Sequence, residues 1–340
     1  MMSVLGGMIA MSVDTGRIFQ NRRSLQNAAD AGVMAGVLEL PQNPAEANDK
    51  AREWLAKQGV APEEITRVEV SQTFIPNDTI YVKLDTHVNW IFARVLGMVS
   101  PSQVGASAKA QVGSLGGHNK LMPWALLQGD SDCLSPQGKA LFGANCAVKV
   151  GADASAIQGW YGALDFDGKG GGSAEYKANI IDGTTETRYC IAGDNSPGCT
   201  STVSVIDTLT GNKTGPTGDG IDERIALMGT ACDSSGNGKE DFSEVFTPTG
   251  MEKPAYVVAC PSSPRLLIIP IVSYQATPVQ TVIIRGWALG YLDSYSCNNC
   301  NGRGHWSVNI KIADAAYSQA AGFLSAYDPT SGITIRRIIE

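Results

Sequence analysis

All eight cysteines of the 340-residue chain lie between Cys133 and Cys300, and this uneven distribution restricts the fold more than any other feature. An even number of cysteines set in Gly-, Asn- and Ser-rich loops is typical of disulfides formed in an oxidising compartment. Eight cysteines allow many pairings, but short loops close at the lowest entropic cost. We therefore predict bonds between sequence neighbours: Cys133–Cys146, Cys190–Cys199, Cys232–Cys260 and Cys297–Cys300.

The amino-terminal residues have the opposite character. Residues 2–13 (MSVLGGMIAMSV) carry no charge, and the run stops at Asp14. As a helix they would span roughly 18 Å, against a hydrocarbon core of about 30 Å. The run is too short for a full crossing, and it lacks the basic start and cleavage site of a signal peptide. It predicts the second half of a membrane helix or an apolar helix buried among other subunits. A buried helix of an ordinary domain is the third alternative.

A second helical pattern follows, from about Thr15 to Leu40. Its apolar side narrows to small residues, because Ala28, Gly32 and Gly36 recur at every fourth position. Small residues at this spacing let another backbone approach closely. Glycine inside a helix costs about 1 kcal/mol against alanine, so two of them indicate a packing role. The stripe predicts a contact with another subunit or with the chain's own domain.

Two blocks in this region carry a family resemblance: Val13-Asp14-Thr15-Gly16-Arg17 and Leu25-Gln26-Asn27-Ala28-Ala29-Asp30-Ala31. Preceded by an apolar run, they resemble the amino-terminal signature of TadE/TadG-like proteins of bacterial tight-adherence (Flp) pilus systems. The resemblance implies a helix that leaves the membrane at the aspartate and continues into the small-residue helix. Family members carry a longer apolar segment here, so we expect a shortened helix or a different mode of embedding.

The rest of the chain predicts an α+β protein. Residues 44–58 have helical periodicity, residues 80–88 and 104–112 alternate as strands, and a short apolar helix is expected over 90–96. Later segments are strand-rich, with strands expected over 265–274, 279–291, 306–312 and 332–339 and one helix-like interruption over 314–326. We expect three parts: an amino-terminal helix (1–43), a small α/β unit (44–117) and a large, disulfide-bonded, mainly β domain (118–340).

Known catalytic patterns are missing from the sequence. GNKTG lacks the upstream glycine of a phosphate-binding loop, and there is no GxSxG or HExxH motif. His87 is expected on the polar face of its strand, at the surface. Cys297 and Cys300, with His305 nearby, have partial zinc spacing, but no second Cys pair accompanies them and a disulfide is favoured. A net charge of −7 without a dense basic run argues against nucleic acid. We expect no enzymatic activity and no required cofactor.

One motif does suggest a ligand. Residues 233–244 (DSSGNGKEDFSE) follow the spacing of a calcium loop, with Gly238 at the turn position. The oxygen donors would be Asp233, Ser235, Asn237, the Lys239 carbonyl, Asp241 and Glu244. The alternative is a solvated turn beside a disulfide.

Together with the resemblance, these features predict a structural or assembly component of a Tad/Flp-type pilus: a minor pilin-like or adhesive subunit in the bacterial envelope. Its partners would be other pilus or envelope subunits and the membrane, reached through the amino-terminal helix, with a homo-oligomer or filament as one outcome. A secreted or surface-anchored β-rich protein that binds carbohydrate is the alternative, with Trp160, Trp287 and Trp306 as candidate lining residues. A glycoside hydrolase with an Asp/Glu pair is a further, less favoured one.

Overall fold

The computed structural model describes residues 2–96, 100–129, 132–151, 157, 160–170, 172–184, 189–196, 199, 203–228, 231–251, 253–300, 304–317 and 322–339. The chain divides into two compact units. Unit 1 consists of Met1–Val112 and Arg336–Glu340, and unit 2 of Gly113–Ile335. The mixed α+β class with a large β domain is confirmed. The helix expected as a separate part (1–43) belongs to the same unit as residues 44–112.

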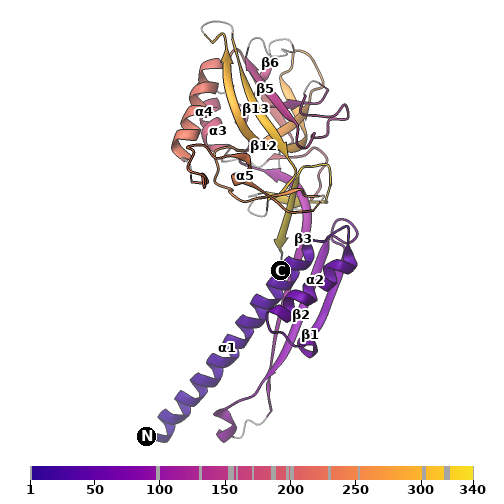
Figure 1. The fold of residues 1–340 in the computed structure, drawn as a ribbon, viewed down its shortest axis with the longest axis vertical. Helices are drawn as coiled ribbons and strands as arrows, with labels where there is room; N and C mark the ends of the chain where they lie inside the picture. The colour runs from indigo at the N-terminus through magenta and orange to yellow at the C-terminus, as the bar shows by residue number, and fades with distance from the viewer. Residues whose placement is uncertain are drawn as a thin grey trace. The chain divides into compact units, whose positions relative to one another are not determined.

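Unit 1 places helices against an antiparallel sheet (Figure 1). Its elements are α1 (Met2–Val37), α2 (Pro44–Lys57), η1 (Pro62–Glu64), β1 (Ile65–Ser71), β2 (Thr79–Val88), η2 (Ala93–Leu96) and the first part of β3 (Ser102–His118). The strand order is β1-β2-β3, with Val68 opposite Val82 and Ile80 opposite Ala110. Ile80, Val82 and Leu84 are fully buried, which confirms the alternation expected over 80–88.

The end of unit 2 returns the chain to unit 1. An Arg336 guanidinium nitrogen donates to the Leu38 carbonyl at 3.0 Å. The Ile339 amide donates to the Lys109 carbonyl at 2.8 Å. Unit 1 is therefore built from segments that lie nearly 300 residues apart in the sequence, since Leu38 and Arg336 are separated by 298 positions.

Unit 2 is strand-rich. Its elements are the end of β3, β4 (Leu126–Leu127), β5 (Asn145–Gly151), β6 (Trp160–Asp165), α3 (Ser173–Asp182), β7 (Tyr189–Cys190), β8 (Val205–Thr210), α4 (Thr214–Met228), α5 (Phe242–Val245), β9 (Phe246–Pro248), β10 (Tyr256–Val258), β11 (Leu266–Ser273), β12 (Thr281–Asn298), β13 (His305–Ala313), β14 (Ala315–Ala316), β15 (Phe323–Ser325) and β16 (Ile333–Ile338).

The main sheet of unit 2 has the order β4-β11-β12-β13-β5, with β8 on β12 and β6 on β8 among the described residues. The helices α3 and α4 lie side by side near β5 and β13 (Figure 1). Tyr176 and Ile180 of α3 and Ile221 of α4 belong to one core cluster with Val308 and Ile310 of β13. Burial of these apolar side chains is what holds the two helices on the sheet.

Arg224 links α3, α4 and the start of β11. It is 7% exposed and donates to the carbonyl oxygens of Pro264, Ile180, Ile181 and Leu266, at 2.7, 3.1, 2.7 and 3.2 Å. Burial lowers the pKa of this guanidinium to about 10, against a partial opposing effect of Asp182. These acceptors match the fixed geometry of a guanidinium, which lysine could not reproduce.

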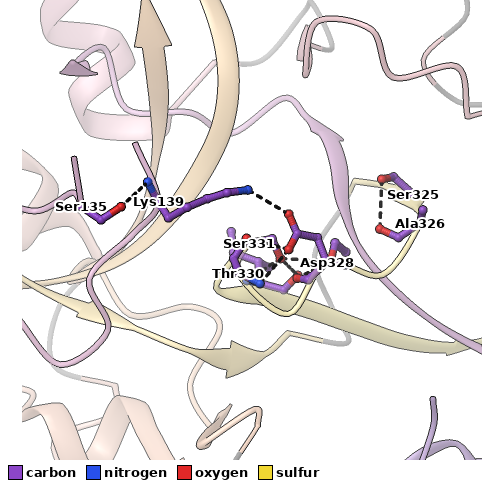
Figure 2. Close-up of polar contacts among 9 residues, drawn as sticks. Ser135, Lys139, Ser325, Ala326, Asp328, Thr330 and Ser331 are labelled. Carbon is purple, nitrogen blue, oxygen red and sulfur yellow. Dashed lines mark hydrogen bonds and ion pairs between the residues drawn. The ribbon is translucent and has the colours of Figure 1, made fainter. Parts of the chain in front are cut away.

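A polar network fixes the turn that precedes β16 (Figure 2). The Asp328 carboxylate accepts hydrogen bonds from the Thr330 amide and hydroxyl, at 2.8 and 2.6 Å, and forms an ion pair with Lys139 at 3.4 Å. The Ser331 hydroxyl lies 3.0 Å from that of Ser114 on β3. These contacts join the 133–146 disulfide loop to the last strand of unit 2.

The helices expected from the sequence are only partly those observed. The prediction over 44–58 is confirmed by α2, but α3 and α4 were missed. In α4, Gly218 and Gly220 look like loop residues, yet both are packing positions. A Cβ at Gly218 would overlap the Trp306 ring, and one at Gly220 would come within 3.0 Å of Ile180.

The helix expected over 314–326 was wrong. Ala315 and Ala316 instead form β14, which pairs in parallel with β10 and β16, and residues 323–325 form β15. Residues 318–321 lie outside the described part. Burial between two strands outweighs the helical propensity of an Ala-rich stretch here. Over 90–96, the structure has only the short 3₁₀ helix η2.

Candidate functional site

Helix α1 differs sharply between its two halves. From Leu25 to Val37 most of its apolar side chains are buried, whereas Met11, Val13 and Phe19 are 59%, 44% and 65% exposed. Figure 1 shows the amino-terminal half of α1 extending past α2 within unit 1. Several exposed large apolar side chains in one stretch of a helix are typical of a surface that something else covers.

The buried half explains the stripe of small residues. Ala28 is 3% exposed, a Cβ on Gly32 would lie 3.1 Å from Leu55, and one on Gly36 would lie 2.7 Å from the Ala47 carbonyl oxygen. The stripe therefore lets α1 pack against α2 and β2. Of the two expected uses, a contact within the chain's own domain is the one observed.

Asp14 fastens the loop between β2 and β3 to the exposed half of α1. Its carboxylate is buried and accepts the amides of Ile91, Phe92 and Ala93 at 3.0, 3.0 and 2.8 Å. Burial alone would raise the pKa of Asp14, but these hydrogen bonds and the nearby Arg17 charge hold it below its ordinary value. Arg17 adds a hydrogen bond to the Asn89 carbonyl at 3.4 Å. We call residues 89–94 the 89–94 loop.

The 89–94 loop is itself apolar and exposed. Ile91 is 51% and Phe92 is 44% exposed, whereas Ala93 is buried against α1. Arg94 is exposed, and so are Arg22 and Arg23 on α1. Phe19, Arg22 and Arg23 also line an open hollow of about 700 Å³, together with Gln20, Gln26 and Asn27. This part of unit 1 thus presents apolar and cationic side chains together.

The eight cysteines form the four disulfides expected from loop length: Cys133–Cys146, Cys190–Cys199, Cys232–Cys260 and Cys297–Cys300. Their Cα–Cα distances are 5.4, 5.8, 6.2 and 5.8 Å, all within the normal range for a disulfide. The zinc alternative at Cys297 and Cys300 is therefore not the one observed. All four bonds lie in unit 2.

The expected calcium loop is closed by its own hydrogen bonds. The Asp233 carboxylate accepts the amides of Gly236, Asn237 and Gly238 at 2.7, 3.1 and 2.7 Å, and Gly238 has the positive φ of +82° expected of the turn position. Glu244 accepts the amides of Ser235 and Asp241 at 2.8 and 2.7 Å. Asp241 accepts from the Asn237 side chain at 2.8 Å. Calcium binding by these residues, with Lys239 contributing its carbonyl, stays a prediction.

A different group of carboxylates comes together in space. Asp165, Asp167 and Glu175 each place an oxygen within 4.8 Å of the others. Asp165 accepts the amides of Gly168 and Gly170 at 3.2 and 2.9 Å, which orders this turn. Burial, with the charges of Asp167 and Asp165, raises the pKa of Glu175. Three ionised carboxylates at this distance repel one another, so the cluster favours binding a proton or a cation. This cluster could not be predicted from sequence patterns, because Glu175 belongs to the unexpected helix α3.

Other candidate residues are explained by packing. His87 is exposed, as expected for the polar face of its strand. Trp160 and Trp287 are only 3% and 1% exposed, and Trp306 donates its indole N–H to the Thr214 carbonyl at 2.6 Å. Trp160 and Trp287 therefore belong to the core and do not line an open carbohydrate site.

Sequence reasoning missed two of the residues that define the surface of unit 1. Ile91 and Phe92 were expected inside a short helix, and the partners of Asp14 lie 77 to 79 positions away. Two sequence features could have indicated this contact. One is the apolar run Trp90-Ile91-Phe92, and the other is the aspartate that follows the uncharged residues 2–13. Within the part of the chain that the structure describes, no helix combines the length and hydropathy needed to cross a membrane.

Comparison with known proteins adds one finding. Residues 1–45 match a family described as putative Flp pilus-assembly TadE/G-like. No curated protein matches the chain, and neither does any solved structure. The match covers all of α1, including Asp14 and the small-residue stripe. Residues 1–45 are therefore similar to the TadE/G-like family that the two sequence blocks resembled.

Proposed function

We propose that the chain is a non-enzymatic structural or assembly component of a Tad/Flp-type pilus, located in the bacterial envelope. The observation that carries the proposal is the TadE/G-like match over residues 1–45, because it coincides with a helix that exposes Met11, Val13 and Phe19. The exposed half would pack among pilus or envelope subunits or at the membrane. Unit 2, held by four disulfides, would be the part exposed to an oxidising exterior.

A minor pilin-like or adhesive role is the specific form that we favour. A long helix whose second half packs on α2 and β2 and whose residues 11–24 are largely exposed suits a subunit that inserts into an assembly. Met11 and Phe19, at 59% and 65% exposed, are large apolar side chains that such an assembly would bury. Burying them removes apolar surface from water and so favours association.

Deletion and complementation in the organism of origin tests this function. We expect loss of the chain to abolish or strongly reduce sheared surface pili, and the wild-type chain to restore them. Phe19→Glu should fail to restore pili at normal protein levels, because it places a charge on the uncovered half of α1. Trp54→Glu is the matched control, since Trp54 is 42% exposed on α2. Normal piliation without the chain would refute the proposal.

A further inference from the structure

The 89–94 loop presents an apolar tip that its own unit leaves uncovered. Ile91 and Phe92 are large side chains, 51% and 44% exposed, at the point where the chain turns from β2 toward β3. A surface loop normally keeps such side chains only where another phase or molecule covers them. Here the tip is also held in place, because Asp14 accepts three consecutive amides of the loop.

The tip continues an apolar surface of α1. Val13 is adjacent to Asp14 in the sequence and Met11 lies within one helical turn of it, and both are exposed. The Asp14 hydrogen bonds bring the tip to this level of the helix. The uncharged residues 2–13 directly precede Asp14 in the sequence. An apolar helix segment and an apolar loop are thus joined by the buried Asp14 carboxylate and by Arg17.

Charge in the two sequence stretches that form this surface is mostly of one sign. Between residues 1 and 29 the acidic residue is Asp14, whose charge is directed at backbone amides, and residues 89–101 contain no acid. Arg17, Arg22, Arg23 and Arg94 supply positive charge in the same stretches, although the chain as a whole carries −7. Cationic side chains beside aromatic and aliphatic ones are typical of segments that lie in an anionic membrane interface.

We propose that the 89–94 loop, held to α1 by Asp14, inserts Ile91 and Phe92 into an anionic bilayer surface as a second membrane contact beside α1. Trp90 would lie at headgroup level, where its amphipathic ring is favoured. Arg94, Arg22 and Arg23 would face lipid phosphates. The inference rests on the envelope location proposed above, and it assigns a lipid surface, not another subunit, to this tip.

The test uses the full chain and vesicles of phosphatidylglycerol with phosphatidylethanolamine, compared with pure phosphatidylcholine. We expect flotation with the anionic vesicles, weakened by added salt. The double variant Ile91→Asp/Phe92→Asp should lower the partition coefficient by about tenfold or more, and Trp54→Asp should leave it unchanged. Asp14→Asn, which keeps the apolar tip but weakens its attachment to α1, should give an intermediate loss.

The depth to which the 89–94 loop enters the bilayer is measured with lipids brominated in the acyl chains. Tryptophan fluorescence should be quenched on binding, and Trp90→Phe should remove most of the quenched component. This readout holds even if the double Asp variant fails to fold. Vesicle binding that is equal in the wild type and the folded double variant would overturn the inference, as would the absence of quenching at Trp90. Cross-linking of the tip to another subunit in place of lipid would also overturn it. None of these outcomes bears on piliation, so the proposed function can fail or stand separately.

Discussion

A buried carboxylate is unfavourable unless its charge is compensated, and Asp14 accepts three consecutive amides of the loop that leads into η2. Backbone N–H groups that converge on one carboxylate stabilise its negative charge. The residue thus fixes the position of a segment more than seventy positions away. At the scale of single residues it is the contact on which the arrangement of α1 and the 89–94 loop most depends.

We predict that Asp14→Asn lowers the Tm of unit 1 by on the order of a few degrees, because a neutral amide is a weaker acceptor for three donors. The pKa of Asp14 is lowered in the folded state, so its stabilising effect is fully present above the ordinary aspartate pKa. The effect is lost as the pH falls through the lowered folded-state pKa. The Tm difference between wild type and variant should therefore be constant near neutral pH and shrink in acid.

Thermal unfolding measured from pH 7 down to pH 3 provides the check. Asp49→Asn, at an exposed position of α2, is the control and should leave the curve unchanged. A Tm difference that stays the same across this pH range would show that the Asp14 charge does not matter.

Among the loops, the 233–244 segment carries a prediction of its own. Calcium should raise the Tm of the wild type at millimolar concentration, through binding to the folded state alone. Glu244→Gln should remove most of the rise, since position 12 supplies two oxygens, yet keep a side-chain acceptor for the Asp241 amide. Differential scanning fluorimetry with calcium and with chelator measures both.

The variant Glu175→Gln distinguishes calcium binding at residues 233–244 from calcium binding at the second group of carboxylates. It removes a charge from the cluster formed with Asp165 and Asp167 and leaves residues 233–244 untouched. A calcium response that survives Glu244→Gln but disappears in Glu175→Gln would assign the ion to that cluster. An unchanged Tm in the wild type would leave 233–244 as a turn closed by its own hydrogen bonds.

Elements with strong periodicity could be predicted from the sequence. The strands β2, β11 and β13 and the helix α2 lie close to where apolar alternation or helical spacing placed them. The misses include α4, whose glycines leave room for Trp306 and Ile180, and β14, whose alanines pair with two distant strands. In both cases a tertiary contact decides the conformation, and local propensity carries no information about it.

The candidate site was predictable in part for the same reason. The half-apolar helix α1 and its small-residue stripe are visible as patterns, and Asp14 is visible as the end of an uncharged run. Its pairing with the amides of Ile91 and Phe92 depends on how β2 and β3 are placed, which no local pattern encodes. The neighbour pairing of the cysteines succeeded because loop closure is a local property.

For the whole molecule, the distribution of cysteines predicts unequal sensitivity to reductant. All four disulfides lie in unit 2, and removing a native disulfide typically costs about 2–5 kcal/mol. Reduction should therefore lower the stability of residues 113–335 and leave residues 1–112 largely protected. Hydrogen exchange resolved by peptide, with and without reductant, would show this. Equal loss of protection in both units would contradict it, as would two or more cysteines that react with an alkylating reagent in denatured, unreduced protein.

The return of residues 336–339 to unit 1 has a consequence for how the protein is made. The large disulfide-bonded unit is an insertion within the smaller one, since the Leu38 and Lys109 carbonyls accept hydrogen bonds from Arg336 and Ile339. During synthesis the segment that emerges first is thus the one completed last, after every cysteine has passed. A stall or a cleavage within the insertion would separate the amino-terminal unit from these two partners. An interruption of the disulfide-bonded unit is in this way passed on to the part of the molecule that contains no sulfur bridge.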